Sequence, residues 1–159
     1  MLLLALATPM KAHSEELPVR GWIEEAKIYP EGVPVKAKLD TGALTSSMDA
    51  KDIEYFEKDG KKWVRFKVVA RSSDTGDESV QAFERAVLRK VKVRGAGGAD
   101  HRPVVSMKIC IGNQLLDEEF SLRDRKKMIY PVLIGRKTLE HVGPVDVRRT
   151  FTQQPSCKA

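Results

Sequence analysis

The sequence has few of the residues that build metal, nucleotide or disulfide-rich sites. Its 159 residues include two cysteines and three histidines. Neither cysteine lies in a Cys-x-x-Cys pair, no His-Glu-x-x-His stretch occurs, and the glycine-rich phosphate loop of ATPases is missing. These absences exclude a disulfide framework, a helical zinc-hydrolase site and phosphate-loop ATP hydrolysis. We therefore expect no cofactor and no metal, and Cys110, which lies in an apolar run, is expected to be a small core residue.

No apolar run is long enough to cross a bilayer as a helix, so we expect no stable membrane insertion. The apolar residues 1–7 are typical of the centre of a secretion signal, although no basic stretch precedes them. Residues 1–12 therefore predict a cleaved signal peptide and a periplasmic or secreted protein. The alternative is a frayed N-terminal segment on a cytoplasmic protein. In either case residues 1–19 are expected to form a leader or a disordered segment.

Acidic residues are outnumbered by basic ones, 22 to 28, which gives a net charge of +6 and a pI near 9.4. This balance favours acidic partners. The densest basic stretches contain no interleaved aromatic residues for base stacking, and the first alternates with apolar residues as a strand does, so nucleic acid is not expected as a partner. Acidic partners of another kind remain.

Turn residues divide the chain into many short apolar segments, a pattern typical of a mainly β protein. With 42% apolar and 31% charged residues, the chain is expected to form one folded domain over residues 20–152, followed by a tail at 153–159. Short helices are predicted at residues 49–56 and 136–141, and a tight hairpin at residues 111–114. Strands are predicted at residues 20–28, 35–39, 62–70, 81–94, 102–111, 114–122 and 132–134.

An acidic residue directly follows one of these strands, in Asp40-Thr41-Gly42-Ala43. A strand end is a rigid platform, glycine allows a close backbone approach, and a threonine hydroxyl can hydrogen-bond across an interface. A carboxylate could thus be held with little freedom. The alternative is an Asp that only forms a turn or caps a helix. A second Asp-Thr-Gly, at residues 74–76, lies in a wholly polar stretch and is interpreted as a turn.

The Asp40 segment resembles the catalytic loop of retropepsin-like aspartic peptidases. Together with Arg102-Pro103-Val104-Val105 and the block at residues 130–136, it is similar to the bacterial retropepsin-like family often labelled "ATP-dependent zinc protease". The resemblance spans roughly residues 21–151 and implies a closed retropepsin-like β-barrel with one or two short helices. An apolar pair before Gly135 is the second hallmark of the family, and it implies that Ile134 contributes to the substrate site beside Ala43.

The resemblance implies a homodimer in which Asp40 pairs with the same residue of a second chain. The two carboxylates would share a proton and activate a water molecule for peptide hydrolysis. Thr41 would lock the two loops together, and Gly42 would leave room for the substrate backbone. By position, the turn at residues 72–79 would be the flap over the substrate, which makes substrate-binding candidates of Ser72, Ser73, Asp74, Thr75 and Gly76.

The sequence departs from the retroviral pattern at two places. Leu44 stands where an acidic residue is usual, four places after the catalytic Asp, so Arg136 lacks its expected ionic partner. The expected flap is polar and acidic, whereas a flap that grips peptides is usually glycine-rich and apolar. These departures motivate an alternative function, a barrel that binds peptides or proteins without turnover. A metal-dependent hydrolase, the third possibility, requires ligands that the sequence does not provide.

Overall fold

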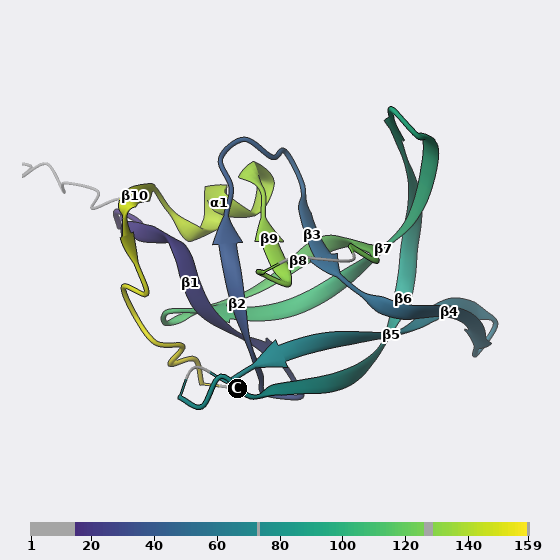
Figure 1. Cartoon of the computed structure of the whole chain (residues 1–159), viewed down its shortest axis with the longest axis horizontal. Helices are drawn as coiled ribbons and strands as arrows, with labels where there is room; N and C mark the ends of the chain where they lie inside the picture. Colours follow the sequence, from purple (N-terminus) through teal and green to yellow (C-terminus); the bar gives the residue numbers. More distant parts are fainter. Residues whose placement is uncertain (1–14, 73, 126–128, 159) are drawn as a thin grey trace, which may run out of the picture.

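A closed β-barrel organises the chain in the computed structural model, which describes residues 15–72, 74–125 and 129–158 (Figure 1). Six strands form it in the order β1, β2, β9, β3, β8 and β7, and pairing of β1 with β7 closes the ring. The mainly β, retropepsin-like barrel expected from the sequence is confirmed. Within the described residues, no helix is long and apolar enough to span a membrane.

The observed strands follow the apolar segments of the sequence closely, and the hairpin at residues 111–114 is confirmed. The strands are β1 (Arg20–Tyr29), β2 (Val33–Leu39), β3 (Ser46–Asp49), β4 (Lys51–Lys58), β5 (Lys61–Arg71), β6 (Glu78–Gly95), β7 (Gly98–Ile111), β8 (Gln114–Arg123), β9 (Val132–Ile134) and β10 (Val145–Thr150).

Alternate residues of the barrel strands point into one core, because successive side chains of a strand lie on opposite faces. In β2 the buried side chains are Val33, Val35, Ala37 and Leu39. Met48, Phe120 and Ile134 join them from β3, β8 and β9. The single helix described, α1 (Arg136–Val142), was predicted, and it adds Leu139 and Val142 to this core.

The helix predicted at residues 49–56 is wrong. This stretch ends β3 and then forms β4, which pairs with β5 in antiparallel register, with Phe56 opposite Trp63. The centroids of the two aromatic rings lie 6.3 Å apart. Cross-strand contacts of this kind stabilise a sheet, and they outweigh a weak local helical preference. Strands β3 and β10 were not predicted either. Strand β3 pairs with β8 and β9, and β10 pairs in parallel with β1.

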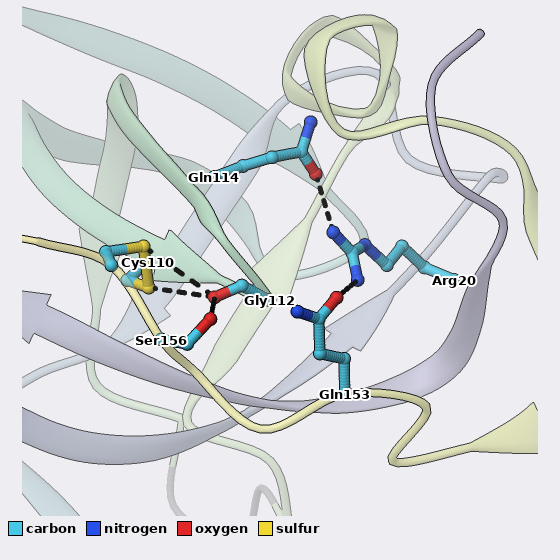
Figure 2. The surroundings of a disulfide bond; sticks show 7 residues. Arg20, Cys110, Gly112, Gln114, Gln153 and Ser156 are labelled. Carbon is cyan, nitrogen blue, oxygen red and sulfur yellow. Dashed lines mark hydrogen bonds between the residues drawn. A yellow bond between two sulfur atoms is a disulfide. The ribbon is translucent and has the colours of Figure 1, made fainter.

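The C-terminal segment is tied to the barrel by a disulfide between Cys110 of β7 and Cys157 (Figure 2). Cys110 is fully buried, as expected of a core residue, but the sequence did not show that it pairs across 47 positions. Beside the disulfide, the backbone N–H of Ser156 donates to the carbonyl of Gly112 at 2.7 Å. Residues 153–158 therefore pack on the barrel wall although they form no strand.

The same region buries the side chain of Arg20, which is 2% exposed. Its guanidinium donates to the amide oxygens of Gln153, at 2.8 Å, and Gln114, at 3.0 Å (Figure 2). Burial lowers the pKa of Arg20, and the nearby carboxylate of Glu24 opposes this effect. Because Gln153 comes from the C-terminal segment, this hydrogen bond is a second attachment of that segment to β1.

We expect the substitution Cys157→Ser to lower the free energy of unfolding by about 4 kcal/mol, because the disulfide closes a long loop in the unfolded chain. Urea denaturation without reductant measures the effect. Reductant should destabilise the wild-type protein by a similar amount, and Lys158→Ser, at the exposed neighbouring position, should have no effect. An unchanged unfolding midpoint in Cys157→Ser would contradict the expectation.

Candidate active site

Asp40 lies at the end of β2, where the alternating strand stops and a short loop begins. Its backbone N–H donates to the carbonyl of Ile134 at 2.8 Å, which extends the parallel pairing of β2 with β9 by one step. The side chain is 28% exposed. The barrel therefore fixes the backbone of Asp40 and leaves its carboxylate accessible from outside.

Within the described part of the chain, two groups interact with the Asp40 carboxylate. The backbone N–H of Gly42 donates to Oδ1 at 2.9 Å, and Lys38 Nζ lies 3.7 Å from Oδ2. A Cβ atom added to Gly42 would lie 3.1 Å from Oδ1, a tight contact. Glycine at this position therefore lets the loop fold closely around the carboxylate.

Residues after β9 hold the Asp40 loop from its other side. The backbone N–H groups of Arg136 and Lys137 donate to the carbonyls of Ala43, at 2.8 Å, and Leu44, at 3.1 Å. The Arg136 guanidinium donates to the carbonyl of Thr41 at 3.0 Å. Leu44 is 53% exposed, and its side chain cannot form an ion pair with Arg136. The Arg136 side chain instead holds the loop by its hydrogen bond to the backbone of Thr41.

Close packing at Gly135 completes this support, as the resemblance implied for the apolar pair before this glycine. A Cβ atom at Gly135 would lie 2.5 Å from the backbone carbonyl of Thr45. The Gly135 N–H donates to Ser46 Oγ at 3.0 Å, and Ser46 Oγ lies 2.8 Å from Thr138 Oγ1 of α1. The sequence did not show that Ser46 and Thr138 take part in this contact. The end of the Asp40 loop is thus packed tightly against the start of α1.

Ile134, a predicted substrate contact, is completely buried in the core. It supports the site through its carbonyl, which accepts from Asp40, rather than through its side chain. The correction follows from strand alternation, because Ile134 shares the inward face of β9 with Val132. Leu133 points to the opposite face, level with Lys38 of β2.

The turn at residues 72–79 does not reach Asp40, which corrects the predicted flap. Asp74 and Thr75 line a cavity with Lys27 and Pro34, near the start of β2, whereas Asp40 follows its last residue. The strand between them is about 20 Å long. Figure 1 shows the turn and the β2–β3 loop at opposite ends of the barrel. Ser72 and Gly76 belong to this turn, and Ser73 lies outside the described residues.

A different hairpin, formed by β6 and β7, rises from the barrel on the same side as the β2–β3 loop (Figure 1). Its tip reads Gly95-Ala96-Gly97-Gly98, the glycine-rich composition that the expected flap lacked. Arg89 and Val91 of β6 line a cavity of about 430 Å³ together with Thr45, at the end of the Asp40 loop. This hairpin, rather than the turn at residues 72–79, adjoins the candidate site.

The geometry described so far is that of a partly exposed aspartate on a rigid strand end, with a cavity at the far end of its loop, at Thr45. Residues 19–156 match the RimB-like family, described as the retropepsin-like aspartic endopeptidase RimB. The chain belongs to this family. The family match and the barrel together bear out the resemblance inferred from the Asp40 loop and the residues around Gly135.

A solved structure from Legionella pneumophila, of a DUF785 protein described as having unknown function, resembles the chain with a TM-score of 0.71. The two are 34% identical, and the match covers 87% of this chain and 98% of the other. A probable alpha-L-glutamate ligase from Desulfotalea psychrophila is 33% identical over 73% of this chain and 25% of its own length. A second probable alpha-L-glutamate ligase, from Shewanella pealeana, is 30% identical over 80% of this chain and 28% of its own length. The chain thus spans about a quarter of the length of these curated relatives.

We expect the substitution Gly135→Ala to destabilise the fold by about 2 kcal/mol, because the added methyl group would collide with the backbone of Thr45 and force the Asp40 loop or α1 to shift. Gly97→Ala is the matched control, since nothing lies within 4 Å of a Cβ atom at that position. Thermal or urea unfolding of the two variants measures the difference. Equal stabilities would show that the contact at Gly135 yields without cost.

Proposed function

We propose that two copies of this chain form an aspartic endopeptidase whose two Asp40 carboxylates lie together and share one proton. The ionised carboxylate would take a proton from a water molecule as its oxygen attacks the peptide carbonyl carbon, while the protonated carboxyl donates to the carbonyl oxygen. When the intermediate collapses, the carboxyl that took the water proton gives it to the amine nitrogen, the C–N bond breaks, and a hydroxyl of the intermediate returns its proton to the other carboxylate. The observation that carries the proposal is the exposed Asp40 carboxylate on a backbone held by β9 and α1.

A dimer is proposed because one chain supplies one suitable aspartate. The second Asp-Thr-Gly lies in the turn at the far end of the barrel, so it cannot serve as the partner within the same chain. Thr41 and Gly42 are exposed at the tip of the loop, where a second loop could meet them. Among the described strands, β10 pairs with β1 alone, which leaves its outer edge open for a further strand.

We propose acidic peptides, and in particular peptides containing glutamate, as the substrates. The net charge of +6 favours them, and Lys38 and Arg136 both contact the Asp40 loop. The relatives named probable alpha-L-glutamate ligases, which contain a region similar to this chain, support the same substrate class. A peptidase domain beside a ligase of this kind would meet the glutamyl peptides that the ligase forms.

A peptide-binding module without turnover is the second candidate. It is favoured by the proximity of Lys38 Nζ to Asp40 Oδ2. The ion pair between these two groups would compete with the second carboxyl group, which has to share a proton with Asp40.

We also propose export to an oxidising compartment. The disulfide supports this localisation, because such bonds persist mainly outside the reducing cytosol.

The variant Asp40→Asn should lose at least about a hundredfold in the rate of peptide cleavage, because it cannot accept the proton from water. Mass spectrometry of a glutamate-rich peptide after incubation with each protein measures this loss. Asp74→Asn, in the second Asp-Thr-Gly, is the control and should cleave at the wild-type rate. If Asp40→Asn cleaves as well as its parent, the proposed chemistry is wrong.

The cleavage rate per chain should rise with protein concentration until dimers predominate, because each chain provides half of the site. Sedimentation velocity over the same concentration range should show the monomer converting to the dimer in parallel. A chain that stays monomeric and cleaves at a constant rate per chain would overturn the two-chain site. A monomer without cleavage would favour the binding module.

A further inference from the structure

Two arginines and one aspartate meet where the β6–β7 hairpin joins the barrel. Arg102 Nε lies 2.9 Å from Asp100 Oδ2, and Arg123 Nε lies 3.3 Å from the same oxygen. Asp100 and Arg102 belong to the β7 arm of the hairpin, whereas Arg123 ends β8. The Asp100 carboxylate is therefore held between the hairpin and the barrel by two guanidinium groups.

The two arginines have more donors than this carboxylate uses. The side chain of Arg102 is only 9% exposed, yet among the described residues its hydrogen bond is from Nε to Asp100 alone. Arg123, at 48% exposure, likewise pairs with Asp100 through Nε, its one ion pair among the residues that the structure describes. Arg102 and Arg123 both line two adjoining cavities of about 400 and 410 Å³, where a guanidinium fork could bind a further carboxylate.

Positive charge is concentrated around this place. Hydrogen bonding from Arg102, together with the charges of Arg102 and Arg123, lowers the pKa of the Asp100 carboxyl. Burial lowers the pKa of the Arg125 guanidinium, the charges of Arg102 and Arg123 lower it further, and Asp49 opposes them. Both effects indicate that the surface around Arg102 and Arg123 stabilises an anion and destabilises a further cation.

Arg102 and Arg123 lie on the same face of the sheet as Lys38, whose ammonium group lies beside the Asp40 carboxylate. Residues that are register partners on neighbouring strands have side chains on the same face. Five residues are linked in this way across β2, β9, β3, β8 and β7: Lys38, Leu133, Ser47, Ser121 and Val104. Arg102 and Arg123 stand two positions further along β7 and β8, on that same face. Leu133, Ser47, Ser121 and Val104 are each less than 10% exposed, and Ser121 and Val104 line the cavity that also contains Thr45. Three strand spacings, or about 14 Å, separate Lys38 from Ser121, which an extended peptide covers in about four residues.

We propose that Arg102 and Arg123 form a carboxylate-binding subsite that recognises an acidic side chain of a bound peptide, and that Asp100 occupies this subsite when no peptide is present. The identity of the ligand as a peptide rests on the proposed function. The subsite would select peptides with an acidic residue several positions from the scissile bond. An incoming carboxylate would displace Asp100 and so release the hairpin from β8 as the peptide binds.

Binding is tested in the Asp40→Asn background, so that cleavage is not needed for the readout. A fluorescent hexaglutamate peptide and its hexaglutamine counterpart are titrated by anisotropy. The further substitution Arg123→Gln should weaken hexaglutamate binding at least tenfold and leave hexaglutamine binding unchanged. Lys92→Gln, which removes the same charge from an exposed position of the same hairpin, is the control and should change neither affinity by more than twofold.

A third variant separates a subsite from a merely structural ion pair. Asp100→Asn removes the internal occupant, so it should bind hexaglutamate several-fold more tightly than its parent. Weaker binding by Asp100→Asn, or equal losses in Arg123→Gln and Lys92→Gln, would overturn the subsite. Selective binding without cleavage by the wild-type protein would uphold the subsite and refute the peptidase. Cleavage without any selectivity for glutamate would refute the subsite alone.

Discussion

The pairing of β2 with β9 is the contact on which the candidate site depends. It positions the backbone of Asp40 through the carbonyl of Ile134, and the chain leaving β9 then binds the rest of the loop through Gly135 and Arg136. Because the two strands are parallel, their ends lie at the same edge of the barrel. An aspartate and its supports, almost a hundred residues apart in the sequence, are thereby brought within hydrogen-bond distance.

The side chains on the two faces of the barrel wall have different roles. Inward side chains such as Ile134 and Leu39 form the core and hold the site from below, whereas outward side chains such as Lys38 and Arg123 meet whatever lies on the surface. A peptide bound over the outer face would touch the Asp40 loop and the base of the β6–β7 hairpin together. Chemistry and selectivity would then lie at two ends of one surface, and ion pairs rather than apolar pockets would distinguish acidic from neutral peptides.

Much of the barrel could be predicted because its strands alternate strongly between apolar and polar residues. Strand β9 and helix α1 follow directly from the apolar run before Gly135 and the short helical stretch after it. The errors occurred where local preference is weak. Residues 49–56 carry a mixed pattern that tertiary pairing with β5 converts into strand, and β10 contains more charged than apolar residues and is held by β1. The disulfide was missed because 47 residues separate its cysteines.

The sequence by itself determined the chemistry available at the site: an aspartate directly after a strand, with a glycine that can fold closely around it and an arginine following Gly135. Only the tertiary structure decided which partners these residues have. It placed Ile134 in the core, put the turn at residues 72–79 at the far end of β2, and brought strand β6 of the glycine-rich hairpin to the cavity that Thr45 lines. The physical reason is that alternation and turn residues are local properties, whereas the order of strands around a closed barrel is set by pairings between distant segments.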